Sequence, residues 1–130
     1  MEQFILVADD DPAILRLIST VIEGEGFLVA TAKDGKEAYA ALKSGANIVA
    51  AIVDNLMPYI AGVDIVKFMR SDKRFENVPI IVMTGDKNPS ASAKALAAGA
   101  VAFLPKPFSN TQLRSTLMTL IQKRDSHAAS

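Results

Sequence analysis

Cysteine and tryptophan are both absent from the 130 residues, and neither sign of charge is in excess. Without cysteine the chain has no disulfide framework, no thiolate nucleophile and no cysteine-ligated zinc or iron–sulfur cluster, which favours a cytoplasmic compartment. The 14 lysines and arginines balance 14 aspartates and glutamates. General binding to nucleic-acid phosphates needs a basic excess, so we expect no direct contact with nucleic acid.

Long apolar runs are also absent. The apolar segment at residues 4–8 ends in three aspartates, which excludes a signal peptide, and no run is long enough to cross a membrane. We therefore expect no membrane insertion. Half of the residues are nevertheless apolar, which is enough to bury a core, and the length suits one domain. We assign residues 1–124 to that domain and residues 125–130 to a short polar tail that frays.

Short apolar runs alternate with longer stretches of helical periodicity. Five runs predict β-strands, at residues 4–8, 27–31, 48–53, 79–83 and 101–104. Between and after them apolar residues recur every three or four positions, which predicts five helices, and Asp11-Pro12 is typical of a helix start. The run at 27–31 is the least apolar, so we expect it at a sheet edge. The pattern predicts an α/β fold, an open doubly wound five-stranded parallel sheet with helices on both faces.

Polar side chains follow four of the predicted strands. Asp9 and Asp10 come after the first, Asp54 after the third, Thr84 after the fourth and Lys106 after the fifth. The carboxyl ends of parallel strands meet at one edge of the sheet, where ligands bind, so we expect these side chains to lie together. Carboxylates that lie close together repel one another unless a cation lies among them. Oxygen ligands with room for water favour Mg²⁺ over Ca²⁺, with Mn²⁺ as a substitute.

A metal held by carboxylates beside a lysine and a threonine suits phosphoryl transfer, because each group stabilises a different phosphoryl oxygen. Asp54 is the candidate nucleophile and Asp10 the candidate metal ligand. Each residue alone also has a commonplace interpretation: loop acids for Asp9 and Asp10, a turn hydroxyl for Thr84, a surface charge for Lys106. Their joint position after four strands is what favours a site.

Several segments together resemble the response-regulator receiver domain of two-component signalling, a family that includes single-domain chemotaxis regulators. They are the strand and acidic cluster at 5–12, Asp54-Asn55-Leu56-Met57-Pro58 with Gly62 beyond it, Thr84-Gly85, Ala98-Gly99-Ala100, and Lys106-Pro107-Phe108. The resemblance covers nearly the whole chain. It implies the flavodoxin-like strand order 2-1-3-4-5.

The resemblance also implies the chemistry of a phosphorelay. Asp54 is expected to accept a phosphoryl group from a phosphohistidine on a histidine kinase or a histidine phosphotransfer protein, which makes the chain a phosphoprotein that carries an aspartyl phosphate. Mg²⁺ is expected to bind Asp10, Asp54 and the backbone carbonyl of Leu56, and Asp9 through water. The chain is then not an enzyme with an external substrate but a signalling switch that is phosphorylated and dephosphorylated at its own residue.

Two further residues are expected to hold the phosphoryl oxygens and to transmit the signal. Thr84 is expected to hydrogen-bond the phosphoryl group, and Lys106 to pair with it across a cis Lys106–Pro107 bond. Thr84, drawn toward the phosphate, is expected to couple to Phe103. The coupling repacks the surface of the fourth helix, fifth strand and fifth helix, where the output partner binds. We expect a monomer or a weak dimer.

Four positions depart from the commonest pattern of the family. Phe103 stands where many members have tyrosine, and Ala61 stands where a polar residue often caps the third helix. Leu56 and Asp86 lie two residues after Asp54 and two after Thr84, where side chains influence hydrolysis of the aspartyl phosphate. Because the apolar Leu56 cannot orient a water molecule, we predict a slow loss of the phosphoryl group.

Two other functions compete with this interpretation. A small Mg²⁺-dependent phosphohydrolase with an aspartyl nucleophile shares the acids, the threonine and the lysine. It also needs a second acid two residues after its nucleophile, where this chain has Leu56. A pseudo-receiver, which binds partners without being phosphorylated, does not need the complete set of acids, threonine and lysine.

Overall fold

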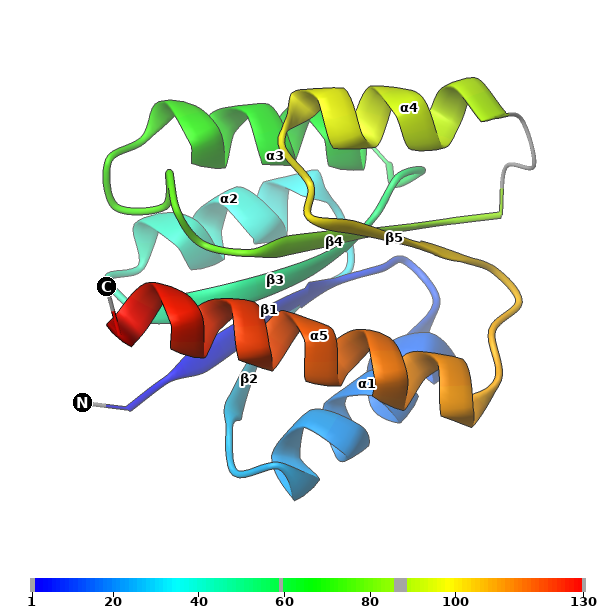
Figure 1. Ribbon diagram of the computed structural model, residues 1–130. Helices are drawn as coiled ribbons and strands as arrows, with labels where there is room; N and C mark the ends of the chain where they lie inside the picture. The colour runs from blue at the N-terminus through cyan, green and yellow to red at the C-terminus, as the bar shows by residue number, and fades with distance from the viewer. Residues whose placement is uncertain (1, 59, 86–88, 130) are drawn as a thin grey trace.

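The computed structural model describes residues 2–58, 60–85 and 89–129, with side chains as far as residue 122. Strands and helices alternate along these ranges (Figure 1). The elements are β1 Phe4–Ala8, α1 Pro12–Gly24, β2 Leu28–Ala32, α2 Gly35–Lys43, β3 Ile48–Asp54, α3 Gly62–Ser71, β4 Ile80–Thr84, α4 Pro89–Ala98, β5 Ala102–Pro105 and α5 Asn110–Ala129. Among the described residues, no helix has both the length and the apolar character needed to span a bilayer.

The five strands form one parallel sheet in the order β2-β1-β3-β4-β5. This confirms the predicted fold class and strand order, and it places β2 at an edge, as its weaker apolar character predicted. β1 and β3 lie inside the sheet and are buried almost throughout, because helices cover both of their faces.

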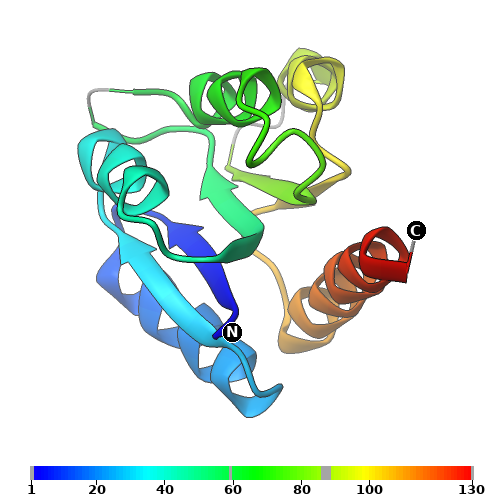
Figure 2. The same cartoon turned by 90° about the vertical axis from the view of Figure 1, so that its left-hand side faces the viewer.

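The sheet separates two apolar cores. Successive residues of β1 alternate between them: Leu6 and Ala8 pack on the side of α2, α3 and α4, while Ile5 and Val7 pack on the side of α1 and α5. Figure 2, which views the molecule from the side, shows these two helical layers on either side of the sheet. The arrangement brings the carboxyl ends of all five strands to one edge.

The bounds of several strands lie later in the chain than the apolar runs predicted. β2 begins at Leu28, β4 ends at Thr84 and β5 ends at Pro105, each about one residue beyond the predicted range. Asp54 belongs to β3, where it pairs with Met83 of β4. A strand ends where its backbone ladder ends, and a polar side chain continues that ladder as well as an apolar one. Two of the candidate site residues are thus held by the sheet itself.

The helix starts agree with the sequence. Asp11 caps α1, because its carboxylate accepts a 2.9 Å hydrogen bond from the N–H of Ala13, and Pro12 is the first helical residue. Ala61 precedes α3 without any side-chain cap, as its apolar side chain predicted.

The structure corrects the prediction of a frayed tail at the end of the chain. The backbone of α5 continues as a helix to Ala129, through residues 125–129. The prediction of a tail relied on the lack of apolar residues there, but a helix that is already nucleated adds one hydrogen bond for each residue it gains and needs no apolar face to continue. The domain boundary at residue 124 stays a prediction.

Candidate functional site

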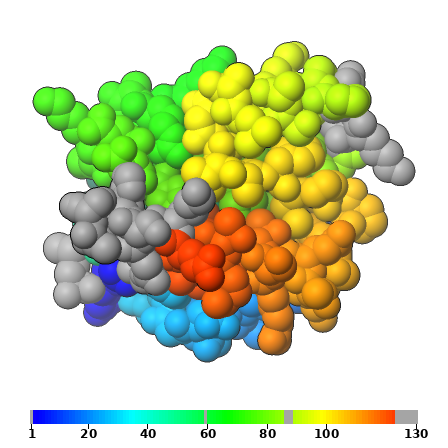
Figure 3. All heavy atoms as spheres, in the orientation of Figure 1, coloured from blue at the N-terminus to red at the C-terminus, as the bar shows by residue number. Residues whose placement is uncertain are grey.

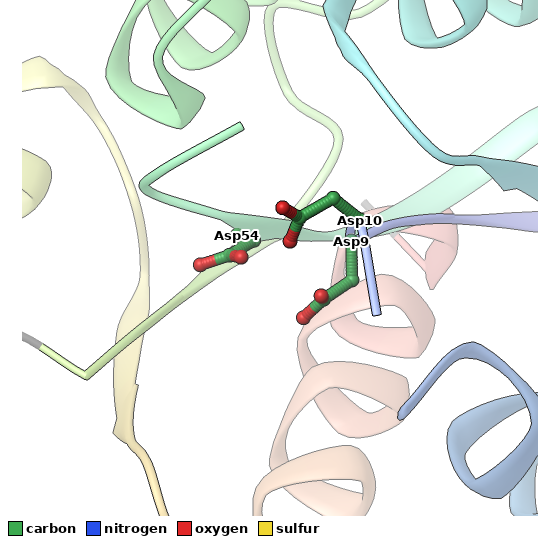
Figure 4. A group of neighbouring side chains, drawn as sticks. All are labelled: Asp9, Asp10 and Asp54. Carbon is green, nitrogen blue, oxygen red and sulfur yellow. The ribbon is translucent and has the colours of Figure 1, made fainter. Parts of the chain in front are cut away.

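Three aspartates meet at the carboxyl edge of the sheet (Figure 4). Asp9 and Asp10 follow β1 and Asp54 ends β3; one carboxylate oxygen of each lies within 4.8 Å of the others. Asp9 is fully buried and Asp54 is 4% exposed, whereas Asp10 is exposed. The predicted acids therefore form one cluster, with two buried members and one open to solvent.

Lys106 reaches this cluster from the loop after β5. Its ammonium nitrogen lies 2.7 Å from Oδ2 of Asp9 and 3.2 Å from Oδ2 of Asp54. The backbone N–H of Lys106 donates a 2.7 Å hydrogen bond to the carbonyl of Thr84, which ties the loop to the end of β4. The Lys106–Pro107 bond is cis, as the resemblance implied. A lysine that sequence alone could assign to the solvated surface thus bridges two buried carboxylates.

Burial and charge act in opposite directions on these groups. Burial raises the pKa of the Asp54 carboxyl, and the charge of Asp9 raises it further, while Lys106 and the N–H of Leu56 act to lower it. For Lys106, burial alone would lower the pKa. The hydrogen bond to Asp9 and the charges of Asp54 and Asp9 outweigh burial, so the pKa of Lys106 lies above 10.5. The ammonium stays charged and partly offsets the repulsion between the acids.

Three of the remaining predicted residues, Thr84, Leu56 and Phe103, lie in the part of the chain that the structure describes. Thr84 is 1% exposed and ends β4, next to β3. The side chain of Leu56 is exposed, and its N–H donates a 3.4 Å hydrogen bond to Oδ1 of Asp54. Phe103 is half-buried on β5, beside Val82 of β4, and packs on the core under α3 and α4. Asp86 lies outside the described residues.

Comparison with known proteins identifies the family that has this geometry. The sequence matches the response regulator receiver domain over residues 5–118. The chain belongs to this family. It is therefore a phospho-accepting signalling domain of two-component regulatory systems, in a family of signalling switches. Members of the family bind Mg²⁺ at an acidic pocket and interact with histidine kinases and output partners.

Two relatives illustrate the range of proteins that contain this receiver domain. The chain is 34% identical over 122 residues to the chemotaxis protein CheY1 of Helicobacter pylori, covering 93% of this chain and 98% of that protein. It is 29% identical over 130 residues to the DNA-binding response regulator MtrA of Mycolicibacterium smegmatis, covering 99% of this chain and 55% of that protein. The receiver fold thus occurs both as nearly a whole protein and as part of a longer one.

Solved structures show the same architecture. The chemotaxis response regulator CheY4 of Vibrio cholerae superposes with a TM-score of 0.83 at 31% identity, over 92% of this chain and 99% of that one. A CheY-like receiver domain protein of Methanospirillum hungatei JF-1 superposes with a TM-score of 0.85 at 26% identity, over 99% and 98% of the two chains.

The donor set of this receiver domain fits a divalent cation. Three carboxylates and one ammonium leave two formal negative charges at one point, which is the charge that such an ion neutralises. All candidate ligands are oxygens, and the exposed Asp10 leaves room for the water ligands that Mg²⁺ retains. Asp9 is partly committed already, because its Oδ1 accepts a 2.9 Å hydrogen bond from the N–H of Asp11.

Two hollows border the cluster, each of about 470 Å³. One is bounded by Asp10 and Leu56 and by the loop that follows β3. The other is largely apolar and lies between α1 and Lys106, with Leu17 and Phe108 in its wall. Neither hollow has a signal of its own in the sequence, because each is formed by residues from distant segments.

Gly62 is a residue whose structural requirement the sequence did not reveal. A Cβ at this position would overlap the carbonyl oxygen of Asp54. The N–H of Gly62 also donates a 3.0 Å hydrogen bond to the carbonyl of Asn55. The loop between β3 and α3 therefore folds back against the backbone of Asp54, and only glycine allows so close an approach.

Proposed function

We propose that this receiver domain accepts a phosphoryl group on Asp54 from a phosphohistidine donor in a Mg²⁺-dependent reaction, and thereby changes its affinity for an output partner. The observation that carries the proposal is the pairing of a nearly buried Asp54 carboxylate with the Lys106 ammonium, inside a cluster of three acids. A structural ion pair alone does not need two further carboxylates that repel the first.

Each residue has a distinct part in the proposed transfer. A carboxylate oxygen of Asp54 attacks phosphorus, and the new O–P bond forms as the P–N bond to the donor imidazole breaks. The ammonium of Lys106, already 3.2 Å from Asp54, pairs with a phosphoryl oxygen, and the hydroxyl of Thr84 donates to another. Asp10, Asp54 and the carbonyl of Leu56 would hold Mg²⁺ directly, and Asp9 would hold it through water; Mn²⁺ could replace it. The ion would neutralise charge on the acids and on the phosphoryl group.

Intact-mass spectrometry tests the acceptor. Wild-type protein is incubated with acetyl phosphate and Mg²⁺, with and without a chelator, beside Asp54→Asn. Asp11→Asn is the matched control, because it removes the same charge from the adjacent loop while asparagine keeps the helix cap. We expect one phosphoryl adduct in wild type and in Asp11→Asn, and none in Asp54→Asn or with chelator. A wild-type protein that binds Mg²⁺ and forms no adduct contradicts the proposal and favours a pseudo-receiver.

The same samples separate the switch from a phosphohydrolase. A switch forms a stoichiometric adduct that persists, whereas a phosphohydrolase turns over many equivalents of an external phosphoester. Leu56, in the position where such an enzyme needs its acid, is 66% exposed and apolar. Continuous release of phosphate from a phosphomonoester such as p-nitrophenyl phosphate would overturn the assignment as a switch.

Thr84 and Phe103 form the transmitting part of the proposal. They lie on adjacent strands, where Thr84 pairs with Pro105 and Phe103 with Val82. A movement of Thr84 toward a phosphoryl oxygen makes room for the ring of Phe103, which packs beneath α4. In the view of Figure 3, α4 and α5 both reach the side of the molecule that faces the viewer, and Figure 1 shows β5 between them. This is the face proposed for the output partner, and the domain acts as a monomer or weak dimer.

NMR with beryllofluoride, a mimic of the acyl phosphate, tests this coupling. We expect Mg²⁺ and beryllofluoride to shift the backbone amide signals of α4 and β5 in wild type. Thr84→Val should bind the mimic while these shifts shrink by at least half, and Thr20→Val, an exposed position on α1, is the matched control. Undiminished shifts in Thr84→Val would contradict the proposed role of the hydroxyl.

A further inference from the structure

Arg70, in the last turn of α3, holds two turns that lie outside the acidic cluster. Its half-buried guanidinium donates to three backbone carbonyls: Nε and Nη2 to Gly99 at 3.1 and 2.8 Å, and Nη1 to Phe75 and Glu76 at 3.1 and 3.2 Å. None of the ion pairs among the described residues involves Arg70. The side chain therefore acts through the backbone of these two turns.

One of these turns is the carboxyl end of α4. The helix closes with two hydrogen bonds, from the N–H of Gly99 to Leu96 and from the N–H of Ala100 to Ala95, both 3.1 Å. Gly99 adopts a φ of 121°, and its carbonyl accepts the hydrogen bonds from Arg70. A Cβ at Gly99 would lie 2.8 Å from Cγ and Nε of Arg70, so the turn lies directly against this side chain. A cation at a helix carboxyl end is also favoured by the helix dipole.

α4 buries less apolar surface than the other helices. The residues it buries are Ala91 and Ala95, whereas each of the other four helices buries at least one leucine, isoleucine or methionine. A fully buried leucine or isoleucine side chain contributes about 1.5 to 3 kcal/mol, and an alanine contributes much less because it has little apolar surface to bury. The hydrogen bonds of Arg70 therefore add to a small apolar contact between α4 and the rest of the domain.

The two ends of α4 lie near opposite ends of the strands. Its amino end follows β4, which ends at Thr84 in the candidate site. Its carboxyl end precedes β5 and is bound by Arg70, near the amino ends of β4 and β5, where the N–H of Val101 donates to Ile80. α3 and α4 pack side by side over the same face of the sheet (Figure 1).

We propose that Arg70 is a positioning residue: it fixes the carboxyl end of α4 and the turn into β5 on α3, so that α4 pivots about this end when its amino end responds to the phosphoryl site. The second half of this proposal rests on the proposed function. The first half concerns the resting protein alone and is tested without phosphorylation.

Hydrogen exchange measured by mass spectrometry tests the attachment. Arg70→Met keeps the length of the side chain without its donors, and Arg70→Lys keeps the charge with a single donor group. Arg74→Met is the matched control, since Arg74 is an exposed arginine four residues away that pairs with Asp72 and lies 4.8 Å from the centre of the Phe75 ring. We expect exchange in peptides covering 89–101 to rise about tenfold or more in Arg70→Met, less in Arg70→Lys and not in Arg74→Met. Peptides from β1 and α1 should change by less than twofold.

Three outcomes would overturn the proposed attachment of α4 by Arg70. Exchange that rises equally in all peptides of Arg70→Met shows a general loss of stability, and exchange that does not rise in 89–101 shows that Arg70 does not hold α4. If Arg70→Lys exchanges in 89–101 at the rate of wild type, charge alone positions the turn without the forked hydrogen bonds. That result also contradicts the proposal.

The pivot is tested with a fluorescent reporter. The chain has no tryptophan, so Ala93→Trp, at an exposed position on α4, reports this helix alone. With Mg²⁺ and beryllofluoride we expect an emission change that falls by at least half when Arg70→Met is added. An unchanged response overturns the pivot. If wild type forms no acetyl phosphate adduct, the proposed function fails, while the exchange experiment still decides the attachment of α4.

Discussion

Gly62→Ala tests how closely the loop after β3 must fold against the phosphoacceptor. The added Cβ would overlap the carbonyl oxygen of Asp54 and lie 2.9 Å from its carbonyl carbon and 3.0 Å from Cα of Asn55. All of these are backbone atoms, so no change of rotamer relieves the overlap. Favourable contact between carbon atoms lies near 3.5 Å, so the loop must move by roughly 0.5 Å or more.

The expected cost follows from that displacement. Overpacking a closely packed position costs about 1 to 3 kcal/mol, and a clash with backbone belongs at the upper end of this range. In urea denaturation with a slope of about 2 kcal/mol per molar, the midpoint should fall by about 1 to 1.5 M. Gly24→Ala is the matched control. Gly24 ends α1, and a Cβ there would have no neighbouring atom within 4 Å, so this variant should be unchanged or more stable by about 0.5 kcal/mol.

The same substitution should also slow phosphorylation. The displaced loop begins directly after Asp54 and carries Leu56, and a misplacement of this size beside a reacting group costs rate. We expect the initial rate of adduct formation with acetyl phosphate to fall about tenfold in Gly62→Ala and to stay unchanged in Gly24→Ala. A Gly62→Ala protein with the midpoint and the rate of wild type would refute the inference from close approach.

Four single substitutions have other expected effects. Lys106→Met leaves the charges of Asp9 and Asp54 without their ammonium partner, so without divalent cations urea denaturation should show a loss of about 2 to 3 kcal/mol; an unshifted midpoint contradicts this. Asp54→Asn removes a carboxyl whose pKa lies above 3.8. Burial raises this pKa most, and the charge of Asp9 raises it further. Ionising that carboxyl costs stability as the pH rises through its folded pKa. Without divalent cations the variant should therefore melt higher than wild type at pH 7, with the difference closing below about pH 4. Asp11→Ala should cost about 1 kcal/mol in the same denaturation assay, because α1 loses its cap, and should keep the phosphoryl adduct. Leu56→Asn should lose its adduct several-fold faster than wild type once acetyl phosphate is removed; equal decay in mass spectrometry would contradict the role of the apolar side chain.

Local patterns were sufficient for the order of the elements. The alternation of apolar runs with helical periodicity predicted the parallel sheet, and Asp11-Pro12 predicted the start of α1. The ends of strands were predicted less well. Asp54 and Thr84 lie inside strands because their backbones pair with neighbours, and pairing is not visible in side-chain hydropathy. The helical backbone of residues 125–129 was missed for a similar reason, since helix propagation depends on the turn before it.

The candidate site was also predicted only in part. The acids and the lysine could be selected from sequence, because a parallel sheet brings the residues after its strands to one edge. The tertiary structure alone decided that Lys106 touches Asp9 and Asp54, and that Arg70 holds the turn at Gly99, 29 residues away along the chain. Spacing along a chain specifies which face or edge a residue occupies, whereas a contact between distant segments depends on how the helices and loops pack in three dimensions.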